Sequence, residues 1–375
     1  MPELIKKLAE KLPCGKKCKL AIIVSLSILL VFCIFVVWQR LYIEQNVFFV
    51  PEVLKNYNTL KSTQVETRQA VTHTLIFGGD VMLARHVQVL QEREGGLTAW
   101  ENIKDELSSA DVAVINLESP FATTGPYPTE GFVFRTKPEN INGLVESGID
   151  VVQLANNHFG NAGEQGMADT FSLLEKENIL YVGAGTSTQA ARQGKVIEVS
   201  GKTIGLVAQS YDVPWYAASS KKSGIATLDV LALGEQIENL KKQGADFIVA
   251  MFHGGIEYVR EPNADQINFA HTAIDAGADV VIGHHPHWIQ NMEEYQGKYI
   301  FYSLGNLIFD QNWSQETSEG LVVKLEINQE NKVNVFLQPV VIENNFKPRW
   351  ATTREAQKIL ENIDIPFSYS LFDNL

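Results

Sequence analysis

Residues 74–80 read TLIFGGD, a short apolar run that ends in two glycines and a carboxylate. More runs rich in Val and Ile follow along the chain, and apolar and polar residues barely alternate within them. They lie at residues 112–115, 151–154, 204–208, 247–252 and 280–282. Such runs are typical of strands that are buried on both faces of a sheet.

Stretches with a helical pattern separate these runs. They lie at residues 97–108, 138–147, 164–177, 227–243 and 263–276. Pro138 and Pro262 suit helix starts, and Gly148, Gly244 and Gly277 suit helix ends. This alternation predicts a layered α/β fold. Beyond it we expect antiparallel strands to complete the sheet, at residues 299–303, 321–327 and 332–341.

The composition excludes two classes of protein. The chain has 375 residues, of which 45% are hydrophobic and 20% charged, and this excludes wholesale disorder. The net charge of −13 argues against a general nucleic-acid binder. Residues 1–19 nevertheless carry six Lys and two Glu, a net charge of +4. The rest of the chain has 25 basic and 42 acidic residues, a net charge of −17.

A predicted membrane span separates the basic head from the acidic body. Residues 20–38 read LAIIVSLSILLVFCIFVVW and contain no charge. A helix of this length crosses roughly 28 Å, close to the hydrocarbon thickness of a bilayer. The lysines before it predict a cytoplasmic N-terminus. A cleaved signal peptide is the alternative, but the long apolar run and the lack of an A-x-A site favour an uncleaved anchor.

These features predict a single-pass protein of the cell membrane with an extracytoplasmic body. The predicted parts are a cytoplasmic basic head (1–19), a transmembrane helix (20–38), a stalk (39–72), the main domain (73–345) and a peripheral tail (346–375). Cys14, Cys18 and Cys33 all lie before the body, so disulfides do not hold it together. We assign no function to Cys14 or Cys18.

Polar residues follow directly on five of the apolar runs. They are Asp80, Glu118, Asn156, Asn157, His158, His253, His284, His285 and His287. Taken alone, Asp80 fits a turn or a helix N-cap, and either asparagine fits a cap. The carboxyl ends of the strands meet at one edge of an α/β sheet, however, and ligands bind there. Carboxylate, amide and imidazole groups together predict a site for Zn, Mn or Fe.

Three imidazoles stand within the segment His284-His285-Pro286-His287. In an extended segment, residues two apart point to the same side. We therefore expect His285 and His287 to face one cavity together, while His284 points away and has a structural role. Pro286 lowers the cost of holding both rings in place.

Six motifs in this order carry a resemblance to a known family: GDVML, NLESP, LANNH, FHGG, GHHPH and YSLGNLIFDQ. Over roughly residues 73–312 the chain resembles the CapA-type capsule proteins of poly-γ-glutamate synthesis. That family is similar in fold to the calcineurin-like metallophosphoesterases. The resemblance implies an α-β-β-α sandwich and a centre with two divalent metal ions, of Mn, Zn or Fe.

The resemblance also implies a role for each residue of the centre. Asp80 and His287 would ligate one metal, and Glu118 would bridge both. Asn157, His253 and His285 would complete the second site. His158 would be the catalytic residue that protonates a leaving group. The sequence departs from the phosphoesterase pattern at two positions. Met82 stands in place of a histidine ligand, and Glu118 stands in place of the bridging Asp. These departures put simple phosphatase activity in doubt.

Other residues near this edge are candidates for binding substrate or supporting the ligands. Arg135 fits either a carboxylate or phosphate clamp or a surface salt bridge. Tyr211 and Trp215 could line a cleft or pack in the core. Residues expected to brace the ligands are Asn156, Asn306 and Asp310.

Two functions remain open from these observations. The first is a membrane-anchored, metal-dependent hydrolase-like protein that acts on an anionic capsule or wall polymer. The second is a non-catalytic scaffold or export factor of a polymer synthase complex, which the span and the acidic exterior fit equally well. No phosphate-binding loop of the G-x-x-x-x-G-K-[ST] type occurs in the chain, so it is not expected to drive polymerisation with ATP.

Overall fold

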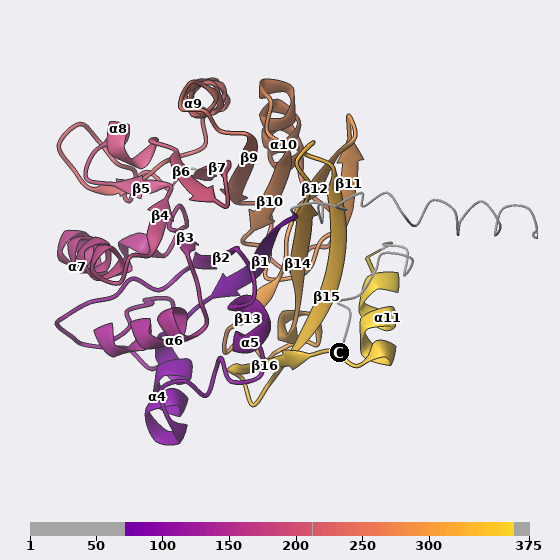
Figure 1. Cartoon of the computed structure of the whole chain (residues 1–375). Coiled ribbons are helices and arrows are strands. Elements are labelled where there is room, and N and C mark those ends of the chain that lie inside the picture. The colour runs from indigo at the N-terminus through magenta and orange to yellow at the C-terminus, as the bar shows by residue number, and fades with distance from the viewer. Residues whose placement is uncertain (1–71, 212, 364–375) are drawn as a thin grey trace, which may run out of the picture. The chain divides into compact units, whose positions relative to one another are not determined.

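Two β-sheets pack face to face in the computed structural model, which describes residues 72–211 and 213–363, and helices cover their outer faces (Figure 1). The predicted α/β layered fold is thereby confirmed. The two sheets and their helices form the four-layer α-β-β-α arrangement that the resemblance implies. The expectation that the runs complete a single sheet is wrong, because six strands between residues 195 and 301 form a sheet of their own.

The first sheet has the strand order β16-β15-β14-β1-β2-β3-β4, with β13 beside the end of β1. Its parallel half comprises β1 (His73–Val81), β2 (Val112–Leu117), β3 (Val151–Gln153) and β4 (Leu180–Val182). Its antiparallel half comprises β14 (Glu319–Ile327), β15 (Val333–Glu343) and β16 (Lys347–Trp350), and β13 (Asn306–Ile308) runs parallel to β1.

The second sheet has the order β11-β12-β10-β9-β7-β6. Its strands are β6 (Lys195–Val199), β7 (Lys202–Ser210), β9 (Phe247–His253), β10 (Val280–His284), β11 (Met292–Tyr295) and β12 (Lys298–Phe301). Four of them, β7, β9, β10 and β12, are parallel. A separate short pair joins β5 (Ala184–Gly185) to β8 (Gly224–Ile225).

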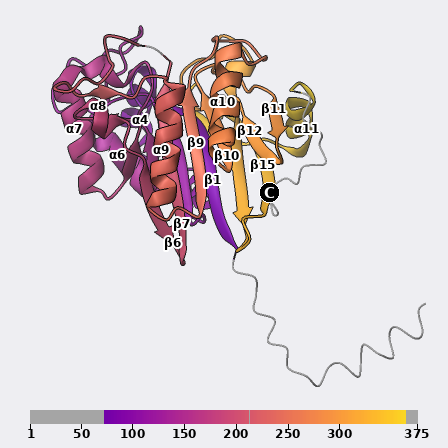
Figure 2. The same cartoon turned by 90° about the horizontal axis from the view of Figure 1, so that it is seen from above.

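Helices pack on the outer face of each sheet. The first sheet is covered by α4 (Arg85–Glu94), α5 (Lys104–Leu107), α6 (Ile141–Glu146) and α7 (Gly163–Lys176). The second is covered by α9 (Val230–Lys242) and α10 (Ala264–Ala276), as Figure 2 shows from above. Shorter helices are α8 (Thr188–Ala191) and the 3-10 turns η2 (Pro138–Asn140), η3 (Phe159–Ala162) and η4 (Glu316–Ser318). The helix predicted over 97–108 is reduced to α5 and the turns before it.

The facing surfaces of the two sheets bury one continuous apolar core. Phe77 of β1 and Met251 of β9 both lie in it and are almost fully buried. This burial explains why the strand runs barely alternate, since the opposite faces of the same strands pack against the helices. Burying a side chain of this size contributes roughly 1.5–3 kcal/mol.

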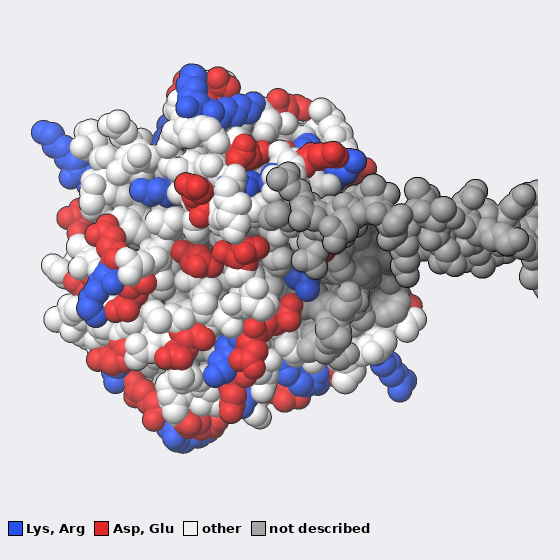
Figure 3. Space-filling view, in the orientation of Figure 1, with Lys and Arg blue, Asp and Glu red and all other residues white. Residues whose placement is uncertain are grey.

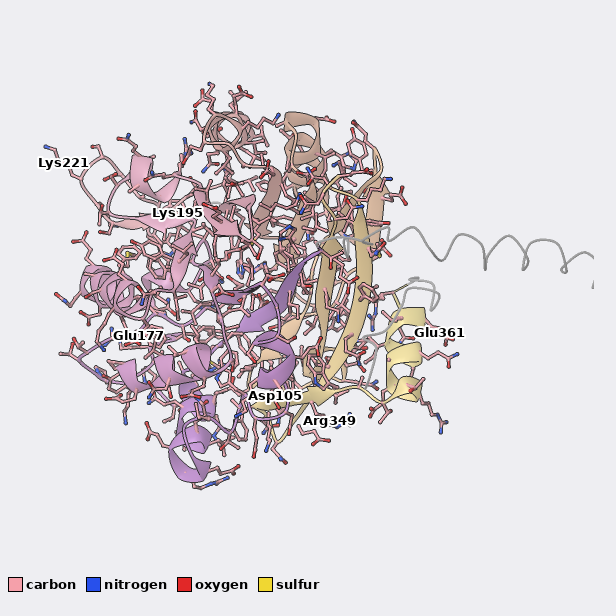
Figure 4. The ribbon with its side chains drawn as sticks, in the orientation of Figure 1. Asp105, Glu177, Lys195, Lys221, Arg349 and Glu361 are labelled. Carbon is pink, nitrogen blue, oxygen red and sulfur yellow. The ribbon has the colours of Figure 1, made fainter. Side chains whose placement is uncertain are left out.

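Residues 347–361 belong to the folded body, so the expectation of a peripheral tail from residue 346 is wrong for them. The strand β16 pairs with β15, and the helix α11 (Thr353–Glu361) buries Ile359 and Leu360 in the core between the sheets. The guanidinium of Arg349 donates hydrogen bonds to both carboxylate oxygens of Glu355, each at 2.9 Å, at the edge of the domain (Figure 4).

The N-terminal cap of α11 provides a test of this correction. The Thr352 hydroxyl accepts a hydrogen bond from the Glu355 N–H, and the Glu355 carboxylate accepts one from the Thr352 N–H. We expect Thr352→Ala to lower the free energy of unfolding by about 1 kcal/mol, and Thr352→Ser to have little effect. Urea unfolding of the full-length protein measures both. An unchanged global transition in Thr352→Ala would mean that α11 unfolds independently of the body.

None of the helices in the described part of the chain is long and apolar enough to cross a membrane. The predicted span at residues 20–38, the basic head and most of the predicted stalk lie outside the described residues.

Candidate metal centre

The predicted ligands meet at the carboxyl edge of both sheets. Asp80 lies near the end of β1, Glu118 follows β2 directly, and His253 ends β9. His284, at the end of β10, places its Nε2 3.2 Å from the carbonyl oxygen of Gly78 and so joins the two sheets at this edge. The chain enters β1 at His73, at the opposite edge.

One group of ligand atoms comes from both sheets. Ligand atoms of Asp80, Glu118 and His287 lie within 4.8 Å of one another, and all three side chains are buried. His287 Nδ1 is 3.1 Å from Asp80 Oδ2 and 3.0 Å from Asn306 Oδ1. A carboxylate pair and an imidazole at this separation could hold one divalent cation.

A second group of ligand atoms surrounds His253. Its Nε2 lies 2.9 Å from Asn157 Oδ1, 3.1 Å from His285 Nδ1 and 3.8 Å from Glu118 Oε1. The two groups therefore share Glu118, the residue to which the resemblance gives the bridging role.

The HHPH segment reaches this arrangement without the extended backbone that we expected. His285 and His287 have φ of 101° and 57°, in the left-handed region that non-glycine residues seldom adopt. The prediction that this segment is extended is therefore wrong, because β10 ends at His284 and the chain turns sharply after it. Both rings nevertheless face the cluster, and such backbone strain is typical of functional sites.

The buried charges of the cluster fit a bound cation. Burial, together with the charges of Asp80 and Glu257, raises the pKa of Glu118 well above its usual value. Its Oε2 is buried and has no hydrogen-bond partner among the described residues. A cation beside Glu118 would displace the proton and satisfy that oxygen.

Asp80, His253 and His285 have the protonation states that metal binding requires. Burial opposes the ionisation of Asp80, but its interactions with His287, His284 and Asn116 together hold the pKa of Asp80 below its usual value. Burial lowers the pKa of His253 strongly and that of His285 to about 3. Both imidazoles are therefore neutral near pH 7 and offer lone pairs to a metal.

Asn116 lies at the centre of the cluster, and sequence reasoning missed it. Its Nδ2 is 2.8 Å from Asp80 Oδ1, 3.3 Å from Glu118 Oε1 and 3.1 Å from His253 Nδ1. Its Oδ1 accepts a hydrogen bond from Asn156 at 3.1 Å. The signal was present, because Asn116 lies two residues before Glu118, and residues two apart in extended chain share a face.

His158 lies beside the cluster in an aromatic and amide environment. Its ring stacks on Phe134 with a centroid distance of 3.8 Å, and its Nδ1 is 3.0 Å from Asn161 Oδ1. Asn161 Oδ1 also accepts a bond from the Phe134 N–H, so it acts as an acceptor and Nδ1 of His158 carries the proton. Burial lowers the pKa of His158 to about 4.

Acidification is expected to destabilise the metal-free protein through His158. Its pKa is 6.5 in the reference state and about 4 when folded, so between these values the unfolded chain binds a proton that the folded chain does not. The contribution, on the order of 3 kcal/mol, is complete above pH 6.5 and is lost as the pH falls toward 4.

Urea unfolding at several pH values, after chelation of metals, measures this contribution by comparison with His158→Asn. Glu118, whose pKa shift has the opposite sign, is common to both proteins and cancels in the difference. Parallel stability curves for the two proteins between pH 7 and pH 4.5 would contradict the assignment.

Arg85 is a second residue that sequence reasoning missed. Its guanidinium forms an ion pair with Asp310, donates to Gly131 O at 2.7 Å, and lies 4.6 Å from the centre of the Phe134 ring. Arg85 thus ties the start of α4 to the loop that supports His158. Asp310, predicted to brace the ligands, instead pairs with this arginine and accepts a hydrogen bond from the His86 N–H at 3.2 Å.

The remaining predicted residues divide into those near the cluster and those away from it. Asn156 accepts a hydrogen bond from the His158 N–H, and Asn306 contacts His287, so both adjoin the site. The Tyr211 ring lies 4.8 Å from that of His285 and also packs against the helix-covered core of the first sheet. Burial raises the pKa of Tyr211 to about 12, so its hydroxyl stays protonated.

The structure argues against a surface salt bridge for Arg135 and against core packing for Trp215. Arg135 makes no ion pair within the described residues, and its guanidinium donates to Pro126 O at 3.4 Å. Trp215 is 67% exposed, so it does not pack in the core. Met82, at the position of the missing histidine ligand, is buried, and its sulfur accepts a contact from Ala84 N at 3.2 Å.

In sequence, the chain is similar to bacterial capsule and PGA biosynthesis proteins. The family model described as "Bacterial capsule synthesis protein PGA_cap" matches residues 74–311. A PGA biosynthesis protein CapA of Bacillus subtilis is 34% identical over 251 residues, 66% of each chain. A capsule biosynthesis protein CapA of Bacillus anthracis is 30% identical and covers 69% of this chain and 65% of its own length. The chain thus spans slightly less than two thirds of these relatives.

Solved structures resemble the chain more distantly. A putative 5'-nucleotidase from Staphylococcus aureus has a TM-score of 0.46 and 16% identity, and the match covers 78% of this chain and 58% of that one. The 5'-nucleotidase precursor from Thermus thermophilus has a TM-score of 0.44 and 14% identity, with the same coverage.

Proposed function

Because the chain belongs to the bacterial capsule synthesis protein family PGA_cap, we propose that it is a membrane-anchored, metal-dependent hydrolase-like protein of capsule or envelope polymer biosynthesis. Its polymer is of the poly-γ-glutamate type. The observation that carries the proposal is the buried cluster in which two sets of ligand atoms share Glu118.

The residues present fit two divalent ions of Mn, Zn or Fe. Asp80 and His287 would hold one ion, and Asn157, His253 and His285 the other, with Glu118 between them. Bound metals in such a centre polarise a substrate oxygen and lower the pKa of a bound water. Asn116 orients the two carboxylates through its amide group, and the strained HHPH segment fixes the two imidazoles.

His158 supplies a proton-transfer group beside the ligands. With a pKa of about 4 and the proton on Nδ1, it is neutral at pH 7 in the metal-free protein. Its Nε2 then accepts a proton, and donation to a leaving group follows only after that protonation. Stacking on Phe134 restricts the rotation of the ring.

The proposed location is the cell membrane, with residues 20–38 as a single anchor and the described domain outside. Support comes from the uncharged run and the six lysines before it. The proposed partners are synthase or export subunits of the capsule system and an anionic polymer, and no nucleic acid is expected. Figure 3 shows acidic side chains spread over one face, so a polyanion would need bound metal to offset the repulsion.

Substrate turnover tests the proposal. Full-length protein loaded with Mn²⁺ or Zn²⁺ is incubated with poly-γ-glutamate, peptidoglycan fragments and phosphoesters, and the product size is measured. We expect shortening of the γ-glutamyl polymer that is lost in His158→Ala. His271→Ala, which changes a histidine outside the cluster, serves as the matched control. Metal-loaded protein that leaves every substrate intact would reject the hydrolase function.

One observation favours the scaffold function as a second candidate. Five exposed apolar side chains lie in loops that follow strands at the same edge as the metal centre. We call them the apolar rim: Phe132 (77% exposed), Trp215 (67%), Trp313 (57%), Ile256 (56%) and Val133 (44%). Exposed aromatic side chains of this kind are enriched in protein interfaces.

Two sets of variants separate the candidates in cells. The paired change His158→Ala and His285→Ala removes the proposed chemistry, and the paired change Trp215→Ser and Trp313→Ser alters the apolar rim. Loss of polymer processing in the first pair supports the hydrolase. Normal polymer output and length in the first pair, with loss in the second, supports the scaffold.

A further inference from the structure

Asn306 points its amide oxygen at the first group of ligand atoms, that of Asp80, Glu118 and His287. It is fully buried at the start of β13, and it is the register partner of Asp80 in the parallel pair of β1 and β13. Paired residues of neighbouring strands share a face of the sheet. Asn306 Oδ1 lies 3.0 Å from His287 Nδ1, and this nitrogen lies 3.1 Å from Asp80 Oδ2. An amide oxygen, a carboxylate oxygen and an imidazole nitrogen therefore meet at one point.

Two buried acceptors fix the orientation of the Asn306 amide. Its Nδ2 donates hydrogen bonds to the carbonyl oxygen of Thr317 at 2.8 Å and to Gln311 Oε1 at 3.1 Å. A carbonyl oxygen only accepts, so the amide atom that faces Thr317 must be the nitrogen. Reversing the amide would set two acceptors against each other inside the protein, which is costly. The folded chain therefore holds Oδ1 toward His287.

These contacts suit a metal ligand better than a bracing residue. A residue that braces a metal-bound histidine contacts the ring nitrogen that the metal leaves free. Asn306 Oδ1 and Asp80 Oδ2 instead converge on one nitrogen, His287 Nδ1. Adjacent ligand atoms of a six-coordinate ion with bonds of about 2.1 Å lie about 3.0 Å apart. The separations around His287 Nδ1 match this spacing, so a cation could replace the proton that the three atoms share.

The position of the missing histidine ligand lies beside β13. Met82 stands at that position, and its sulfur accepts a contact from Ala84 N at 3.2 Å. The Met82 N–H donates to Ile308 O at 2.8 Å. The strand β13 thus runs next to the place where the phosphoesterase pattern has a histidine, and it begins with Asn306. An amide oxygen from this strand could take the place of the missing imidazole.

We propose that Asn306 is a direct ligand of the ion at the first group, and the proposal rests on the two-ion centre of the proposed function. The first group then supplies three oxygens and one imidazole. The second group supplies two oxygens and two imidazoles, from Glu118, Asn157, His253 and His285. Carboxylate and carbonyl oxygens suit Mn²⁺, whereas imidazole suits Zn²⁺. The ratio of Mn²⁺ affinity to Zn²⁺ affinity is therefore higher at the first group than at the second.

Calorimetric titration of the chelated full-length protein with Mn²⁺, and separately with Zn²⁺, tests this assignment. His285→Ala leaves the first group as the binding site, and His287→Ala leaves the second. We expect the ratio of Mn²⁺ to Zn²⁺ affinity to be about tenfold higher in His285→Ala. Adding Asn306→Leu to His285→Ala should weaken Mn²⁺ binding about tenfold and Zn²⁺ binding only about threefold, because zinc accepts three protein ligands and a water. A residue that only braced His287 would change both affinities by the same factor.

Asn306→Asp provides a second test that does not depend on the folding of Asn306→Leu. A carboxylate in place of an amide ligand should raise the Mn²⁺ affinity of the first group about tenfold. On a bracing residue the same charge would stabilise a protonated His287 and lower that affinity. The matched control is Asn140→Leu, at a buried asparagine whose amide bonds to Thr136 and Gln91, and it should change neither affinity.

The outcomes separate this assignment from the proposed function. Equal losses of Mn²⁺ and Zn²⁺ affinity in Asn306→Leu, or a lower Mn²⁺ affinity in Asn306→Asp, would overturn the assignment and leave the two-ion centre intact. Wild-type protein that binds no metal would overturn both. Because every measurement here is a binding constant, intact polymer in the turnover assay would reject the hydrolase function alone.

Discussion

Glu118→Gln is expected to remove divalent metal from both halves of the cluster, with a loss of affinity of roughly 100-fold or more. The reason is that Glu118 contributes to both groups of ligand atoms and has one oxygen with no protein partner. The amide keeps the size of the side chain but lacks the charge that a cation requires. Elemental analysis after dialysis against Mn²⁺ or Zn²⁺, and calorimetric titration, measure the result.

Single histidine variants show whether the two groups are separate sites. His287→Ala should lower the metal content of the first group alone, and His285→Ala that of the second alone. His271→Ala, at a partly exposed histidine paired with Glu293, should leave the metal content unchanged. Full metal content in Glu118→Gln would disprove the shared ligand, and a metal-free protein with full function would remove the basis of the proposed chemistry.

Gly79→Ala is expected to lower the free energy of unfolding by about 3 kcal/mol and to weaken metal binding as well. A Cβ at Gly79 would lie 2.1 Å from the carbonyl oxygen of Gly305, which is backbone and has little freedom to move. The same oxygen accepts a hydrogen bond from the Asp80 N–H at 2.9 Å. The added methyl group therefore displaces the segment that carries Asp80.

Gly234→Ala on α9 is the matched control for Gly79→Ala. Apart from the adjacent backbone of α9, no described atom lies within 4 Å of the position that a Cβ would take there, and a glycine within a helix is unfavourable. The control should raise the free energy of unfolding by about 0.5–1 kcal/mol. Urea unfolding of the full-length proteins gives both values. Wild-type stability in Gly79→Ala would show that β1 and the turn at Gly305 can separate without cost.

The strands could be predicted from local patterns, but their partners could not. The pattern of residues 74–80 predicts a strand that is buried on both faces, and β1 is buried on both faces. Its neighbours are β2 on one side and β14, more than 230 residues later, on the other. Pairing over such separations depends on the whole fold, so the division into two sheets escaped residue-level reasoning. The capping box Thr352-x-x-Glu355, in contrast, is a readable signal for α11 that we missed.

The residues of the candidate site could likewise be predicted only where a local sequence pattern marks them. Asp80, Glu118 and the histidines could be found because each polar residue ends an apolar run. Asn116 lies within β2, between Ile115 and Leu117, and was hidden by these apolar neighbours. Arg85 was hidden for a different reason, because its role depends on Asp310, which comes from a distant part of the chain.

The entry of the chain at His73 has a mechanical consequence. If residues 20–38 anchor the chain as proposed, a pull on that anchor acts at the amino end of β1, about 23 Å along the strand from Asp80. Hydrogen bonds to β14 and to β2 hold β1 on both sides, so the load is shared in shear by two neighbouring strands before it reaches the carboxyl edge. A load that enters at His73 would therefore act on the strand pairing of the sheet before it reached Asp80.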